Sequence, residues 1–188
     1  MADLPVLQTK ERGSITAWIT EKLSVLIAVT TVVLAVMATL ASFKAAGYGN
    51  RMVLAQNQAS DQWAYYQAKS IKETTYQVQR DMMAIAAEHF PQPESLNQKI
   101  AAYDQEIARY KKEKQEIYEE AKRLERVRDM AQAFNGMFGR ALIFLQIGIL
   151  FASISSINKV PYYWYIGVVS GIAGIMWFIY ASYISAAF

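Results

Sequence analysis

The residues whose types and spacing could support binding chemistry are concentrated in one polar and aromatic run, 57–70. On a helix, Asp61, Tyr65 and Lys69 are spaced four residues apart, so their side chains lie in a row along one face, where neighbours can hydrogen-bond to each other. One interpretation is a belt that binds a ligand or partner, and the other is packing against a second helix or subunit. The spacing favours packing. The candidate interaction belt comprises Asp61, Gln62, Trp63, Tyr65, Tyr66 and Lys69.

Several classes of chemistry are excluded by composition. The chain has no Cys and one His, which excludes disulfides, thiolate metal sites, cysteine nucleophiles and paired-His metal sites. Glu116, Glu119 and Glu120 are surrounded by Lys and Arg, so we interpret them as a solvated face and not as a metal site. The sequence holds no phosphate loop, dinucleotide fingerprint or nucleophile elbow. We therefore expect no catalytic, cofactor-binding or metal-binding residue and no enzymatic activity, and a net charge of +3 is too weak to indicate nucleic-acid binding.

The elements that must position these residues follow from where charges are missing. Of the 188 residues, 54% are hydrophobic and only 19% are charged. Three long stretches hold no charge at all, and about 20 apolar residues suffice for a helix to cross a bilayer. The sequence predicts an N-terminal tail with an interfacial segment (1–22) and three transmembrane helices, at 23–43, 141–157 and 162–187.

Small and polar residues within these spans predict how the membrane helices pack. Gly167 and Gly171 have the GxxxG spacing that allows close helix approach, and Gly174 extends the small-residue face. Gln146 is the most polar side chain within a span. A hydrogen bond between helices and the lining of a pore are both open interpretations of this amide, because polar groups in membranes face protein or water.

The segment 44–140 carries a helical pattern interrupted at Pro91–Pro93, where two prolines cannot continue a helix. The arms on either side, 44–90 and 94–140, are equal in length. This predicts a long antiparallel, coiled-coil-like hairpin with its tip at 91–93, inserted between the first and second transmembrane helices of an all-α membrane protein. Glycines near the membrane ends of both arms suggest either a hinge or close helix packing (Gly47, Gly49, Gly136 and Gly139).

Apolar residues mark the contact faces of both arms. The second arm has a heptad seam with steps of three and four, in which Lys114 fills one slot. On the first arm, Ala59, Trp63 and Tyr66 form a stripe that Ile71, Val78, Met82 and Ile85 continue at nearby phase. The second-arm seam holds more apolar surface than one partner arm can cover, which predicts self-association. Its members are Ile100, Tyr103, Ile107, Tyr110, Ile117 and Leu124.

The run from Asn57 to Lys69, ending in S-D-Q-W-A-Y-Y-Q-A-K, resembles an uncharacterised family of bacterial inner-membrane proteins defined only as a domain of unknown function. The resemblance implies the same layout, an anchor helix, a helical hairpin and two closing membrane helices, in a bacterial inner membrane. It implies no activity.

Three functional hypotheses are compatible with this architecture. We favour a non-enzymatic protein that self-assembles or scaffolds through its hairpin, with the lipid bilayer and further copies of itself as partners. An oligomeric pore is the first alternative, and an accessory subunit beside other membrane proteins is the second. Basic residues near the short segments, Lys10, Arg12, Lys22 and Lys159, predict a cytoplasmic N-terminus and a periplasmic hairpin, although Lys44, Arg51 and Arg140 oppose this orientation.

Overall fold

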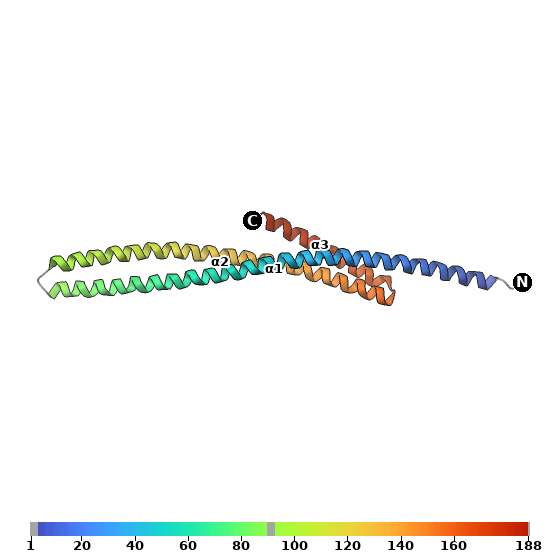
Figure 1. The fold of residues 1–188 in the computed structure, drawn as a ribbon, viewed down its shortest axis with the longest axis horizontal. Helices are drawn as coiled ribbons and strands as arrows, with labels where there is room; N and C mark the ends of the chain where they lie inside the picture. The colour runs from blue at the N-terminus through green and yellow to red at the C-terminus, as the bar shows by residue number, and fades with distance from the viewer. Residues whose placement is uncertain (1–3, 90–92, 188) are drawn as a thin grey trace. The chain divides into compact units, whose positions relative to one another are not determined.

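The structure, a computed structural model, describes the backbone of residues 4–89 and 93–187 and the side chains of 22–88 and 94–187. Three helices account for almost all of it: α1 spans Leu4–His89, α2 spans Pro93–Asn158 and α3 spans Pro161–Ala186 (Figure 1). No strand occurs among these described residues, which confirms the all-helical prediction. Of the predicted break at Pro91–Pro93, Pro91 and Gln92 lie outside the described part, and Pro93 begins α2.

Prolines account for where two of the helices begin. Pro93 is the first residue of α2, and Pro161 is the first residue of α3. Proline is tolerated in the first helical turn because the backbone N–H that it lacks has no partner there in any helix. No proline lies in the described helix interiors beyond the first turn, so nothing of this kind interrupts α1 or α2.

The chain divides into two compact units, whose boundaries lie within α1 and α2. Unit 1 contains Met1–Gly49 and Gln132–Phe188, and unit 2 contains Asn50–Ala131. Within the described residues, each of the three helices includes a stretch long and apolar enough to cross a membrane. These stretches support membrane association on length and composition.

Unit 1 packs parts of all three helices around two small apolar clusters. Leu34 and Leu145 form the centre of the first cluster, together with Ala38 and Ala41. Phe138 is fully buried in the second, where its ring contacts Phe178 at 5.6 Å between centroids. Much of the remaining apolar surface of the unit is exposed on every helix, including Val29, Val36, Ile143, Leu150, Val169 and Met176.

The connection between α2 and α3 consists of Lys159 and Val160. Lys159 has φ of 53°, in the left-handed region that L-residues seldom adopt. Val160 is extended, and its carbonyl oxygen accepts a 2.8 Å hydrogen bond from the buried hydroxyl of Ser155. The turn is thus closed by a side chain from the preceding helix.

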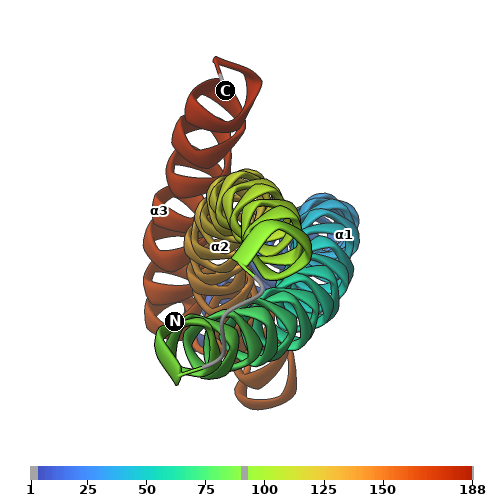
Figure 2. The same cartoon turned by 90° about the vertical axis from the view of Figure 1, so that its left-hand side faces the viewer.

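Unit 2 is a pair of helical segments, one from α1 and one from α2, that lie side by side (Figures 1 and 2). As residue numbers rise on α1, those of the contacted residues on α2 fall. Trp63 contacts Glu125, Lys69 contacts Glu113 and Arg80 contacts Asp104. The last of these contacts shows that the pairing continues nearly to the described ends of the two segments, which run antiparallel.

Candidate interaction site

Between Gln62 and Arg80, the face of α1 that contacts α2 is largely polar, whereas Ala55 and Ala59 are buried on it nearer the start of unit 2. Its residues recur at steps of four and three, which is the heptad spacing of helices that pack along their length. Glu73 lies near the middle of this face and is only 7% exposed. We call this set the inner face of α1; its members are Gln62, Tyr66, Lys69, Glu73, Tyr76 and Arg80.

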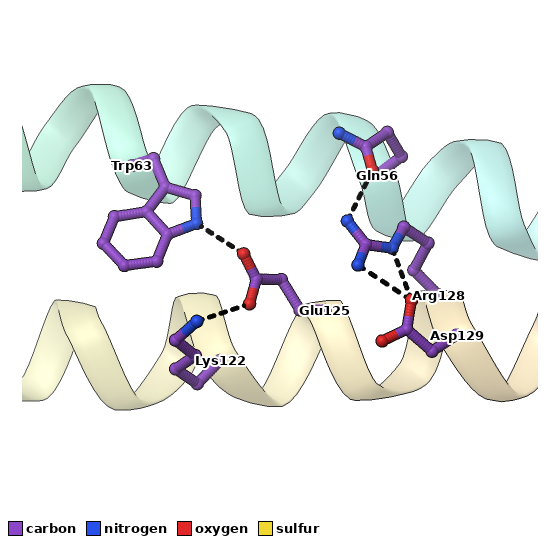
Figure 3. A network of polar contacts seen from close by, with 6 residues as sticks. All are labelled: Gln56, Trp63, Lys122, Glu125, Arg128 and Asp129. Carbon is purple, nitrogen blue, oxygen red and sulfur yellow. Dashed lines mark hydrogen bonds and ion pairs between the residues drawn. The ribbon is translucent and has the colours of Figure 1, made fainter.

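Trp63 is the centre of one polar network on this helix pair (Figure 3). Its indole N–H donates a 3.0 Å hydrogen bond to Glu125, and the Lys122 ammonium donates a 2.9 Å bond to the other carboxylate oxygen. Lys122 also lies 5.4 Å from the centre of the Trp63 ring, so the cation is placed between a carboxylate and a π face. Nearby, Arg128 donates to Gln56 and Asp129.

Ion pairs also join the two helices, among them Arg80–Asp104. Lys69 bonds to Glu113 across the pair. Lys114 donates both to Glu73, at 2.9 Å, and to the Ser70 hydroxyl, at 3.1 Å. Burial of a charge is strongly unfavourable unless it is paired and hydrogen-bonded, so each of these partners depends on the other.

Tyrosines fill the space between the charged pairs. The Tyr76 ring stacks on Tyr110 at 5.6 Å and meets Tyr103 edge-on at 5.5 Å. Tyr118 contacts Trp63 edge-on at 5.6 Å. Such aromatic pairs stabilise packing by about 0.5–1.5 kcal/mol beyond the area they bury. The polar and aromatic groups therefore hold the two helices together.

The ion pairs shift the pKa values of their members. Hydrogen bonding to Lys69 lowers the pKa of Glu113, and hydrogen bonding to Lys122, with a further contribution from Trp63, lowers the pKa of Glu125. Reciprocally, the bond to Glu113 raises the pKa of Lys69, and the bond to Glu125 raises the pKa of Lys122. All four groups remain charged at neutral pH, as structural ion pairs require.

The structure separates the predicted belt into two sets. Trp63, Tyr66 and Lys69 contact α2, and Gln62 is half-buried. Asp61 and Tyr65 are exposed, although the Lys69 ammonium lies 5.2 Å from the Tyr65 ring centre.

The predicted contact stripe of the first arm is corrected. Ile71, Val78, Met82 and Ile85 do not continue the stripe of Ala59, Trp63 and Tyr66. All four are exposed, because charged residues occupy the inner face of α1 in this region and rotate the apolar side outward. Periodicity in one helix could not show this, since the charges on α1 are neutralised by partners on α2.

The predicted α2 seam lies against α1. Ile107, Tyr110, Ile117 and Leu124 are buried, and Ile100 and Tyr103 are half-buried. The expectation that this seam has surplus apolar surface was therefore wrong. The surplus is on α1, where Ile71 and Met82 are 68% and 65% exposed.

In unit 1 the three predicted packing glycines are buried at helix contacts. A Cβ atom on Gly167 would lie 2.8 Å from the Gly148 carbonyl oxygen, and one on Gly171 would lie 2.6 Å from a Leu34 methyl group. Gly174 meets Leu145 in the same way. Gln146 is exposed and lines an open groove whose other residues are Ala38, Thr39, Ser42, Phe43 and Leu142.

The glycines proposed as a hinge or packing site lie within uninterrupted α1 and α2. Only Gly49 has a close neighbour: an added Cβ would lie 3.1 Å from the amide nitrogen of Asn135, which itself donates to the Ala45 carbonyl. No heavy atom lies within 4 Å of a Cβ built on Gly47, Gly136 or Gly139.

Sequence reasoning missed several residues that the contacts require. Glu73 is the partner of Lys114, and a lysine in an apolar seam could have signalled that the facing helix supplies an acid. Gly148 faces Gly167, and its spacing from Ala152 is the small-xxx-small pattern that was noticed only on the last helix. Arg123 binds Glu120 of its own helix with two guanidinium nitrogens.

Among the described residues there is no group of three or more His, Asp or Glu side chains that could hold a metal.

The comparisons with known proteins place the chain in a family. No curated protein and no solved structure matches the chain. Residues 23–184 match the family model described as "Domain of unknown function (DUF4337)". This match, over most of the chain, confirms the resemblance to an uncharacterised family, and the protein is therefore a member of the DUF4337 family.

Proposed function

We propose that this protein is a multi-pass protein of a bacterial inner membrane that self-assembles or scaffolds through an extramembrane helical hairpin and catalyses no reaction. The membrane part of the proposal is supported by unit 1. Aliphatic side chains are exposed on all three of its helices, and 23–43 contains no charged residue. Water is a poor solvent for such a surface, whereas lipid chains match it.

One observation carries the scaffolding role: the outward side of α1 in unit 2 carries an exposed apolar stripe among polar residues, while charged residues lie on its inner face. Ile71 and Met82 are exposed, and Glu73 is buried in an ion pair. Of the polar and aromatic groups that could have formed a ligand site, Trp63, Tyr66 and Lys69 are engaged in contacts with α2. The exposed apolar side chains of α1 in unit 2 form a surface suited to contact with another protein.

The proposal is tested by native mass spectrometry on protein purified in mild detergent at its native abundance. We expect masses that are multiples of the 21.2 kDa chain. A strictly monomeric species would contradict self-assembly, and a single copy bound to foreign chains would instead identify an accessory subunit.

The hairpin itself is tested by cysteines at Tyr76 and Ile107 of one chain. Tyr76 contacts Tyr103 and Tyr110, which flank Ile107 by four and three residues, so this pair should cross-link within the chain. The matched control combines Tyr76→Cys with Lys112→Cys, since Lys112 is exposed. Cross-linking of the control but not of the test pair would contradict the hairpin.

An oligomeric pore is the second candidate, and the groove in unit 1 favours it. Ser42 and Gln146 are exposed there on helices proposed to cross the membrane, while the Thr39 hydroxyl donates to the Ala35 carbonyl of its own helix. Polar groups in a membrane require protein or water beside them. A pore predicts single-channel conductance in planar bilayers that changes with Gln146→Leu, whereas a scaffold predicts no conductance in either protein.

A further inference from the structure

We propose that the exposed stripe on α1 of unit 2 binds the same stripe of a second copy, forming a parallel, in-register, two-stranded coiled coil. The stripe, called the outer stripe here, comprises Ile71, Thr75, Val78 and Met82. The inference rests on the proposed function, since it names the surface and the partner through which self-assembly occurs.

The spacing of the outer stripe matches a helical partner. Its residues follow one another at steps of four, three and four, the spacing of alternate d and a positions in a heptad repeat. Ala64 and Ala68, also exposed, continue the same phase toward the start of unit 2. Ile71, Val78 and Met82 are 68%, 47% and 65% exposed, and they line one open groove on α1. Narrow stripes with this period are typical of coiled-coil seams and not of lipid-facing helices, whose apolar surface is broader.

The placement of charged residues on the inner face of α1 and of apolar residues on its outer stripe favours an outer partner. An isolated amphipathic helix pair gains stability by turning its apolar sides toward each other. Here α1 turns Lys69, Glu73 and Arg80 toward α2 and leaves Ile71 and Met82 outside. This arrangement is favourable when a second apolar surface covers the outer stripe, because both faces of α1 are then satisfied.

The flanking residues favour a second copy in parallel orientation. In a parallel coiled coil, each g residue of one chain faces the following e residue of the other. The g positions beside the outer stripe hold Gln67, Thr74 and Asp81, and the e positions facing them hold Lys72, Gln79 and Ala86. No pair of like charges results at these positions, and the seam ends at Ala64 because the next position in the same phase holds Asp61. Copies anchored in one membrane also share one orientation, and anchoring raises their effective concentration.

The absence of native cysteine allows a direct test in membranes containing the full-length protein. Ile71→Cys and Met82→Cys, each as the only cysteine in its chain, are oxidised separately. Both should form disulfide-linked dimers, because a parallel two-fold axis places each residue beside its own copy. Gln105→Cys is the matched control: it is exposed on α2 at a similar level of unit 2, and should remain monomeric.

The outcomes separate this inference from the proposed function. Dimers that form only when the Ile71→Cys and Met82→Cys proteins are mixed would overturn the parallel register. A multimer by native mass spectrometry without cross-links at either position would overturn the outer stripe as its interface but leave self-assembly standing. Cross-links to a different protein would overturn the choice of a second copy, and a monomer by both methods would overturn both proposals.

A charge placed in the outer stripe supplies an independent measurement. Val78→Asp places two aspartates face to face in the proposed seam and should reduce the Met82→Cys dimer by more than about tenfold. Gln105→Asp should leave this dimer unchanged. Circular dichroism confirms that each variant keeps its helices, and an unchanged dimer yield in folded Val78→Asp protein would overturn the inference.

Discussion

At the scale of single residues, the unit 2 helix pair depends on charges that neutralise one another. Glu73 and Lys114 show why the sequence predicted the α2 seam better than the α1 face. The apolar residues of the seam can be recognised from the sequence of α2 alone. Glu73 can be buried only because Lys114, on the other helix, neutralises its charge. The apolar periodicity of one helix does not show which of its charged residues will pair with residues of another helix.

Removal of Glu73 should be more harmful than removal of the whole ion pair. Glu73→Ala leaves Lys114 without its carboxylate, and we expect the free energy of unfolding to fall by about 1–3 kcal/mol. The double variant Glu73→Leu/Lys114→Met, which restores apolar packing, should recover most of this loss. Thermal unfolding followed by circular dichroism measures both, and equal losses in the two variants would contradict the pairing argument.

Acid should weaken unit 2 through Glu113 and Glu125. Their pKa values are lowered in the folded protein, so their stabilising contribution is fully present above the unfolded value of about 4.3 and is lost as pH falls through the lower folded values. The melting temperature should therefore decline below about pH 4.3.

Glu125→Gln is the matched variant for this pH dependence. The amide oxygen can still accept the Trp63 hydrogen bond, but the group no longer titrates. Part of the acid-dependent decline should disappear in this variant. An identical pH profile in the variant and the parent protein would show that Glu125 makes no such contribution.

At the scale of helices, the predictable and unpredictable features have different physical origins. The charge-free stretch after Lys159 predicted where α3 lies, since the absence of charge is a local property of one segment. The close approach of Gly148 to Gly167 could be predicted only in part. A small residue permits contact, but the choice of the facing residue depends on how two helices are aligned.

The glycine contact gives a test with an internal control. Gly167→Ala would place a methyl group 2.8 Å from a backbone oxygen, so the helices must separate, and we expect a loss of about 1–3 kcal/mol in stability. Gly136→Ala, with no heavy atom within 4 Å, should instead gain up to about 1 kcal/mol because alanine favours helix. Melting temperatures in one detergent would compare them, and a stabilised Gly167→Ala would contradict the contact.

At the scale of the whole molecule, composition predicted three helices capable of crossing a membrane, because the absence of charge over a long stretch is a property of sequence itself. The orientation of those helices in a membrane is predicted from a weaker signal, the unequal number of basic residues on its two sides. Lys10, Arg12, Lys22 and Lys159 favour one side, and the short-segment rule gives them greater influence than the many charges of 44–140.

Labelling should establish this orientation. Single cysteines replacing Asn97, near the start of α2, and Lys159 are treated with a membrane-impermeant maleimide. In intact spheroplasts Asn97→Cys should react and Lys159→Cys should not, while both should react after lysis. The opposite pattern would place the hairpin in the cytoplasm.

The short connection between α2 and α3 has a consequence for biosynthesis. Only Lys159 and Val160 separate the helices, and the Ser155 hydroxyl bonds to the Val160 carbonyl. If α2 and α3 cross a bilayer as proposed, a connection of two residues keeps their joined ends at one depth, so we expect the two helices to insert together as an antiparallel pair.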